Sequence, residues 1–221
     1  MFTGLVEKTA TVVSITLKAG SSGTSILLKV VLPKLSTEDS LVSVNHGDSI
    51  AVDGCCLTVV DSLKKTDSLS LSFELSSETL SLTNFTALKP GDLVHVEQAM
   101  RLSDRLGGHL VSGHIDGLGL VQNFAKNELG FVKMTIVLPK SMSRWLVKKG
   151  SICISGVSLT INDLLTHDSA PLVELCLIPE TLQRTKLGSL RVGDSVHVEC
   201  DLIGKHVDRL MLCWQNEADH A

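Results

Sequence analysis

The sequence predicts an all-β protein built from two similar halves and followed by one C-terminal helix. Three observations support this prediction: an internal repeat, short β-type segments separated by turn residues, and a final segment whose apolar residues recur at helical spacing. Of its 221 residues, 43% are hydrophobic and 20% are charged, which is typical of a globular chain.

The internal repeat consists of three pairs of blocks that share one offset of 102 residues. The pairs are Val52–Asp61 with Ile154–Asp163, Ser76–Leu80 with Ile178–Leu182, and Gly91–Glu97 with Gly193–Glu199. A fourth pair, Phe2–Val6 with Val111–Ile115, has an offset of 109, because surface loops tolerate insertions. We therefore predict an N-terminal domain over residues 1–97, a homologous C-terminal domain over residues 98–201, and a tail over residues 202–221.

Both halves show strand patterns. The segments that are short and rich in β-branched or alternating apolar residues are Thr11–Ile15, Leu57–Val60, Leu69–Phe73 and Leu93–Glu97. Turn residues gather at 19–23 and 89–92, and short helices are expected to open at Pro33 and Pro139. About six short strands per half fit either a small closed barrel or a sandwich, and this reasoning leaves both open.

The tail breaks the repeat. Val207, Leu210, Met211 and Trp214 recur at helical spacing, so we expect an amphipathic helix from about Gly204 to Asn216. Neither half needs this apolar stripe for its own core. We therefore expect it to pack against a partner subunit.

Composition excludes several classes of function. The net charge of −4 argues against nucleic acid as the main partner, and no apolar run approaches the roughly 18 residues of a membrane span. None of the six cysteines has C-x-x-C spacing, so we expect no zinc site or other metal site. The start of the chain lacks a signal-peptide pattern, and reduced thiols in a cytoplasmic or organellar protein are the simplest interpretation.

Each half carries one Gly-x-Ser/Cys-Leu-Thr block, at Gly54–Thr58 and at Gly156–Thr160. Residues two apart in a strand face the same side, so Cys56 and Thr58 share a face, and so do Ser158 and Thr160. We expect only Cys56, and not Cys55, to line a pocket. The alternative is a purely structural strand start whose hydroxyl groups bind nearby backbone.

The densest motif is Gly107–His114, a glycine-flanked segment that would bring His114 to a site as a general acid or base. The alternative for His109 and for His114 is a structural histidine. The two lie five residues apart, which is a poor match to familiar metal-ligand spacings.

Together with the opening Met1–Glu7 and with Ile178–Leu182, these blocks resemble the riboflavin synthase family of the alpha-chain type, over residues 1–201. The resemblance implies two six-stranded Greek-key closed barrels, a C-terminal helix and a homotrimer. It implies a cofactor-free dismutation of two molecules of 6,7-dimethyl-8-ribityllumazine per site, giving riboflavin and 5-amino-6-ribitylaminouracil. It also implies an active site between the N-half of one subunit and the C-half of a neighbour.

The family's site residues are carried over by position. The N-half pocket should contain Gly4, Leu5, Val6, Cys56, Leu57, Thr58, Glu74, Leu75, Ser76, Ser77, Glu78 and Thr79. The C-half pocket should contain Gly113, His114, Ile115, Lys149, Ser158, Leu159, Thr160, Ile178, Pro179, Glu180, Thr181, Leu182 and Gln183. The positions that match those tied to catalysis are Ser49, Cys56, His114, Ser158, Thr160 and Asp201.

The roles implied for these groups leave alternatives open. Either Cys56 or a bound water would add to C7 of one lumazine. Ser158, Thr160 and His114 would move protons or hold ring carbonyls, and Asp201 would assist deprotonation or bind ribityl hydroxyls. One departure from the repeat is Ser155, which stands where the N-half has Asp53.

Two other functions compete with the enzyme. A non-catalytic lumazine- or flavin-binding protein of the antenna type would share the fold, and so would a duplicated barrel that serves as an interaction module and binds no small molecule. Both halves keep their Gly-x-Ser/Cys-Leu-Thr and Glu-Thr-Leu blocks, which favours the enzyme. Lumazine synthase is a candidate partner.

Overall fold

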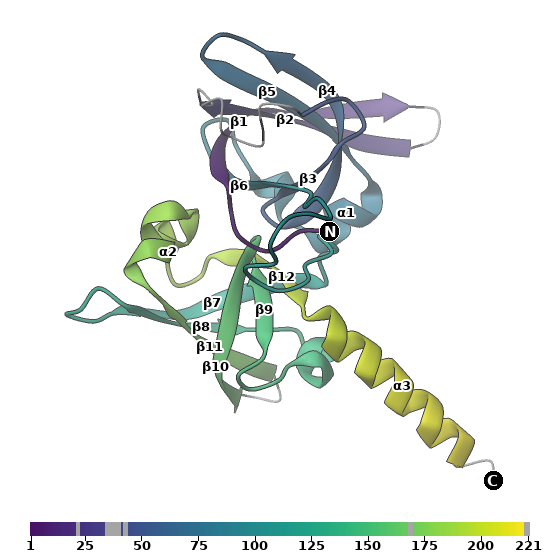
Figure 1. The fold of residues 1–221 in the computed structure, drawn as a ribbon, viewed down its shortest axis with the longest axis vertical. Helices are drawn as coiled ribbons and strands as arrows, with labels where there is room; N and C mark the ends of the chain where they lie inside the picture. The colour runs from purple at the N-terminus through teal and green to yellow at the C-terminus, as the bar shows by residue number, and fades with distance from the viewer. Residues whose placement is uncertain (21–22, 34–40, 42–43, 168–169, 219–221) are drawn as a thin grey trace.

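The computed structural model describes residues 1–20, 23–33, 41, 44–167 and 170–218. It contains two closed six-stranded antiparallel barrels that lie one beside the other, and a long C-terminal helix that projects away from both (Figure 1). This confirms the predicted fold class. Because both sheets are closed, each half is a barrel and not a sandwich.

The first barrel has the strand order β1-β2-β5-β4-β3-β6. Its strands are β1 (Lys8–Gly20), β2 (Gly23–Pro33), β3 (Ser49–Val52), β4 (Cys55–Lys64), β5 (Ser68–Leu75) and β6 (Leu93–Gln98). Between β5 and β6 lie the short helices α1 (Ser77–Leu82) and η2 (Phe85–Ala87). The Ser76 hydroxyl caps α1 by accepting the Thr79 N–H.

The second barrel repeats this order as β7-β8-β11-β10-β9-β12. Its strands are β7 (Gly117–Lys126), β8 (Val132–Val137), β9 (Ser151–Ile154), β10 (Val157–His167), β11 (Ala170–Leu177) and β12 (Ser195–Cys200). Its short helices are η3 (Lys140–Trp145), α2 (Pro179–Arg184) and η4 (Lys186–Ser189). The four segments expected to be strands all lie within strands.

The two prolines expected to open helices have different outcomes. Pro139 directly precedes η3, which is a 3-10 helix, so a short helical segment does begin there. Pro33 ends β2, and the helix expected after it falls at residues outside the described part of the chain.

Each barrel has its own core, filled by the inward-facing residues of its strands. In β4 the side chains of Cys55, Leu57 and Val59 are buried, whereas Thr58 between them is exposed. Phe73 and Leu28 are fully buried in the first core, and Met134 and Ile136 fill the second. The alternation expected for a half-buried strand is therefore present.

The segments before β1 and before β7 meet between the barrels. Phe2 and Val111 form an antiparallel bridge, with N···O distances of 2.7 and 3.1 Å. The two barrels also touch at Gly54 and Gly156, where a Cβ on Gly54 would lie 2.6 Å from the Gly156 nitrogen. Both contacts join equivalent positions of the repeat, so the two halves are related by an approximate two-fold axis.

Two buried histidines link the barrels on either side of this axis. His95 Nδ1 donates to the Ser155 carbonyl at 2.6 Å, and its Nε2 accepts the Lys186 N–H at 2.7 Å. His197 does the same with the Asp53 carbonyl at 2.9 Å and the Asn84 N–H at 3.1 Å. Each imidazole therefore needs its neutral form, because Nε2 is an acceptor.

A buried ion pair breaks the symmetry of this contact. Asp53 forms a salt bridge with Lys186 across the two halves, and its counterpart in the repeat is the neutral Ser155. Burial alone would raise the pKa of Asp53, but the cation of Lys186 beside it holds that pKa below its usual value. The departure seen in the sequence at Ser155 thus marks the uncharged side of the interface.

The C-terminal helix α3 (Leu202–Ala218) touches the second barrel only near its start. Asp208 accepts hydrogen bonds from Arg144 Nε and Trp145 Nε1 of η3, and Lys205 pairs with Asp116 at 2.7 Å. The large apolar side chains left exposed along the helix are Ile203, Val207, Leu210, Met211 and Trp214.

All six cysteines are free thiols. Among the helices in the described part of the chain, none has the length and apolar character needed to cross a membrane.

Candidate functional site

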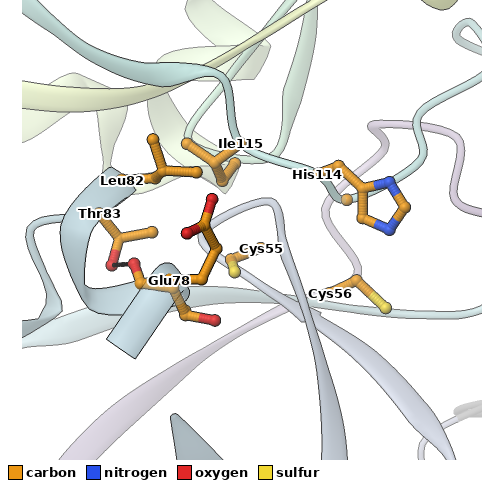
Figure 2. Close-up of a pocket in the computed structure, with 9 residues that line it drawn as sticks. Cys55, Cys56, Glu78, Leu82, Thr83, His114 and Ile115 are labelled. Atoms are coloured by element: carbon orange, nitrogen blue, oxygen red, sulfur yellow. Dashed lines mark hydrogen bonds between the residues drawn. The ribbon is translucent and has the colours of Figure 1, made fainter. Parts of the chain in front are cut away.

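A cavity of about 250 Å³ opens on the first barrel, where β4, α1 and the segment before β7 meet (Figure 2). It is lined by Cys55, Cys56, Glu78, Thr79, Leu82, Thr83, Gly113, His114 and Ile115. Six of these are residues that the family resemblance predicts for the site: Cys56, Glu78, Thr79, Gly113, His114 and Ile115.

The rim of this cavity comes from the other half of the chain. The Cys56 N–H donates to the Gly113 carbonyl at 2.8 Å, and Ile115 is buried in the core of the first barrel. His114 between them is exposed at the cavity (Figure 2). Assigning Gly113–Ile115 to the C-half pocket was therefore wrong, because the segment crosses to the first barrel before it enters β7.

The exchange is reciprocal. The Ser158 N–H donates to the Gly4 carbonyl at 2.8 Å, and Val6 packs against the core of the second barrel. Leu5, the counterpart of His114, is 51% exposed. Assigning Gly4–Val6 to the N-half pocket was wrong for the same reason. A one-dimensional repeat shows which residues are equivalent, but not which barrel each segment covers.

Glycine is required at both crossings. Gly113 has φ +82° and Gly4 has φ +74°, in the left-handed region that L side chains disfavour. A Cβ on Gly113 would lie 2.5 Å from the Cys56 Cβ, and one on Gly4 would lie 2.7 Å from the Ser158 Cβ. Both segments therefore lie directly on the strand that carries the pocket residue.

Cys55 and Cys56 both reach the cavity, which corrects the expectation that only Cys56 would. They do point to opposite sides of β4: Cys55 belongs to the core and Cys56 is half-buried beside His114 (Figure 2). The cavity wraps around the start of the strand and so touches both. Burial raises the pKa of the Cys55 thiol to about 12, so Cys55 stays protonated. Cys56 is the thiol that a ligand can approach.

The equivalent position in the second barrel has different chemistry. Ser158 replaces Cys56, and its hydroxyl lies 2.7 Å from Nδ1 of His109. Burial lowers the pKa of His109, whereas the negative charge of Asp201 opposes that shift. His109 therefore lies beside a predicted site residue, and its lowered pKa favours the neutral imidazole, whose ring nitrogens provide one donor and one acceptor.

Asp201 lies away from the first cavity. It is half-buried between β12 and α3, and its carboxylate accepts the Ile203 N–H at 3.0 Å, as a helix cap does. A second cavity, of about 290 Å³, lies between Asp201, Trp145 of η3 and Val207 of α3. The structure thus brings Cys56 and His114 together, and places Asp201 in another part of the second half.

The remaining predicted residues fall into three groups. Core or partly buried side chains are Leu57, Leu75, Leu159 and Leu182. Those at paired strand positions outside the cores are Ser49 opposite Thr58, and Thr160 opposite Ser151. The third group lies at the ends of strands and on the short helices. It consists of Glu74 at the end of β5, Ser76 and Ser77 at the start of α1, Ile178, Pro179, Glu180, Thr181 and Gln183 at or in α2, and Lys149 in the turn before β9.

Sequence reasoning missed three lining residues, Cys55, Leu82 and Thr83. Leu82 and Thr83 lie just beyond the Ser76–Leu80 block, so the end of that block was the available signal. Within the described residues, no group of three His, Cys, Asp or Glu side chains is arranged to hold a metal ion.

Comparison with known proteins supplies the family. A model described as the lumazine binding domain matches the chain twice, over residues 3–99 and 112–201. The riboflavin synthase of Mycobacterium tuberculosis (strain H37Rv) is 38% identical over 213 residues, which covers 96% of this chain and 98% of that protein. The chain belongs to the riboflavin synthase family. The riboflavin synthase of Bacillus subtilis (strain 168) is 36% identical, covering 96% of this chain and 90% of that protein.

Solved structures of LumP are also similar to this member of the riboflavin synthase family. LumP complexed with 6,7-dimethyl-8-(1'-D-ribityl) lumazine superposes with a TM-score of 0.73 at 26% identity, covering 90% of this chain and 99% of LumP. LumP complexed with riboflavin gives the same TM-score at 27% identity. The two-barrel fold of this family therefore also occurs in a protein solved with a lumazine and with a flavin.

Proposed function

We propose that the protein is a riboflavin synthase. It joins two molecules of 6,7-dimethyl-8-ribityllumazine by transfer of a four-carbon unit, and releases riboflavin and 5-amino-6-(D-ribitylamino)uracil. The observation that carries the proposal is full-length similarity to curated riboflavin synthases in a chain whose two halves both keep their pocket blocks.

The chemistry suits a site made only of side chains. The C7 methyl of the lumazine is acidic, because its carbanion delocalises into the electron-poor ring. The protein then has to orient two rings and move protons, and orientation alone can supply on the order of 7–11 kcal/mol. We expect no organic cofactor and no metal to take part.

The roles of individual residues follow from their positions. Cys56, or a water held beside it, is the group proposed to add to C7 of the lumazine in the first barrel. His114 at the rim is the proposed proton carrier there. In the second barrel Ser158, held by His109, and Thr160 are proposed to bind or move protons. Ser49 and Asp201 complete the proposed catalytic set.

The reaction needs both pockets to meet, and in a single chain they lie on different barrels. We propose that the site forms between the first barrel of one subunit and the second barrel of a neighbour in a homotrimer. The exposed apolar side chains of α3 support this proposal. Truncation before Gly204 should shift the particle to monomers in sedimentation and abolish turnover. A truncated chain that remains a trimer would remove this role from α3.

A cytoplasmic location and an association with lumazine synthase belong to the same proposal. The substrate is itself a lumazine, so an enzyme that forms lumazines must supply it. Co-sedimentation of the purified protein with lumazine synthase tests the association directly, and separate sedimentation at micromolar concentrations of both would argue against it.

The assay that tests the reaction is simple. Purified protein and 6,7-dimethyl-8-ribityllumazine should give one riboflavin and one pyrimidinedione per two lumazines, with no added nucleotide and in the presence of a chelator. The second candidate is a binding protein like LumP, whose solved structures share this fold. It predicts persistent blue fluorescence of bound lumazine and no riboflavin.

A further inference from the structure

Two buried glutamates hold the two crossing segments. Glu97 on β6 accepts the Thr3 N–H at 2.6 Å, the Thr3 hydroxyl at 2.7 Å and the Gly4 N–H at 3.1 Å. Its counterpart in the repeat, Glu199 on β12, accepts the Ser112 N–H at 2.6 Å, the Ser112 hydroxyl at 2.7 Å and the Gly113 N–H at 2.9 Å.

The network continues to the rim residues themselves. The hydroxyl that each glutamate holds accepts a further N–H, from Leu5 at 3.1 Å and from His114 at 3.2 Å. The carbonyls of Gly4 and Gly113 then accept the N–H of Ser158 and of Cys56 across the barrel interface. A continuous chain of hydrogen bonds therefore runs from each carboxylate to a predicted site residue of the opposite barrel, Ser158 on β10 or Cys56 on β4.

We propose that Glu97 and Glu199 are positioning residues that act crosswise. Glu199, on the second barrel, sets the segment that lines the first-barrel cavity at Cys56, and Glu97, on the first barrel, sets the segment that lies against Ser158 of the second barrel. Neither carboxylate needs to touch a ligand. The proposal rests on the proposed function only in taking the two pockets as ligand sites.

A carboxylate is the side chain that suits this position. Three donors converge on each one, and an ionised carboxylate is an acceptor at both oxygens. Burial raises the pKa of Glu97 and of Glu199, and the donors from Thr3, Gly4, Ser112 and Gly113 oppose that rise. A glutamine of the same size keeps one acceptor oxygen but turns an NH₂ group toward one of the donors.

The test reads each pocket separately through one thiol. In a parent chain carrying Cys176→Ser and Cys213→Ser, which removes the two exposed cysteines, Cys56 is the remaining thiol that is not buried. Its labelling rate with a small maleimide, with and without riboflavin, reports on the first pocket. A second parent, which carries Cys56→Ser and Ser158→Cys in addition to Cys176→Ser and Cys213→Ser, places the same reporter at position 158 of the second barrel.

The two glutamine variants serve as controls for each other. Glu199→Gln should speed labelling at Cys56 and weaken riboflavin protection there about tenfold, the loss of one charge-assisted hydrogen bond, and should leave position 158 unchanged. Glu97→Gln should do the reverse. A structural role alone would lower Tm and alter both reporters alike, so equal effects at the two positions would overturn the proposal, as would no effect at either.

If the glutamine variants do not fold, Ser112→Ala and Thr3→Ala test the same network, because each removes only the bridging hydroxyl. Ser112→Ala should affect Cys56 alone, and the opposite pattern or no pattern overturns the proposal. Labelling needs no turnover. A crossed pattern in labelling rates with no protection by riboflavin in any chain would uphold the positioning role and count against the proposed function.

Discussion

The two halves of this molecule share one backbone plan and differ in their polar chemistry. The first pocket presents the thiol of Cys56 beside His114, whereas the equivalent place in the second half presents the hydroxyl of Ser158 with Leu5 at the rim. The interface between the barrels shows the same contrast, because the charged Asp53 of the first half is equivalent to the neutral Ser155 of the second half. Two equivalent positions with different groups suit a reaction in which identical substrates play opposite roles.

The largest difference between equivalent substitutions in the two halves should be a difference in unfolding free energy at the interface between the barrels. Lys186→Met leaves Asp53 buried without its cation, and breaking a buried pair in this way costs about 3–5 kcal/mol of unfolding free energy. The matched change on the neutral side, Asn84→Ala, removes only two hydrogen bonds to Ser195, so it should cost about 1–2 kcal/mol. Urea unfolding of both variants measures the difference. Equal losses would show that the two sides of the interface are equivalent in energy.

The crossing of the rim segments should be the next most sensitive feature. Gly113→Ala places a methyl group 2.5 Å from the Cys56 Cβ, and we expect at least about a hundredfold loss of kcat/KM, because a displacement of about 1 Å at a reacting site costs that much. Gly91→Ala is the control, since Gly91 has φ +97° but open space around its Cα. Similar kinetics for both variants would mean that backbone strain, and not the crossing, explains the loss.

The two adjacent cysteines should separate catalysis from packing. Cys56→Ala should lower kcat about tenfold or more with little change in riboflavin affinity, as expected for a group that acts in the transition state. Cys55→Ala should leave kcat close to its starting value and lower stability by about 1 kcal/mol, because Cys55 packs in the core. Steady-state kinetics and thermal melts on both variants give the answer, and matching profiles would remove the distinction between the two thiols.

Acid should weaken the interface that the two halves share. Burial lowers the pKa of His95 and of His197, so the unfolded chain takes up protons first as the pH falls below about 6.5. Stability is then lost with decreasing pH, by up to about 1.4 kcal/mol per pH unit for each histidine. Tm should therefore drop between pH 7.5 and 5.5. His197→Gln should show a shallower drop, and an unchanged slope in that variant would assign the effect to other groups.

The amino-acid sequence by itself determined the repeat, the β character of both halves and the helical tail. These properties are local or periodic: alternation in β4, turn residues between strands, and one offset shared by three blocks. The prediction that Cys56 and His114 belong to one site also followed from the blocks and the family they resemble, and both line the same cavity. Such features can be predicted from the sequence, because each depends on residues that are close together in the chain.

Tertiary structure alone decided which residues meet. The structure shows that Gly113–Ile115 contact the first barrel and Gly4–Val6 the second, because each segment crosses the approximate two-fold axis before its own barrel begins. The structure also shows that Cys55 lines the cavity and that Asp201 lies away from Cys56. Glu97 and Glu199 bind segments that are about ninety residues away in the sequence. An internal repeat shows which residues of the two halves are equivalent, but it does not show which barrel each segment contacts. Only the packing of one barrel against the other decides that.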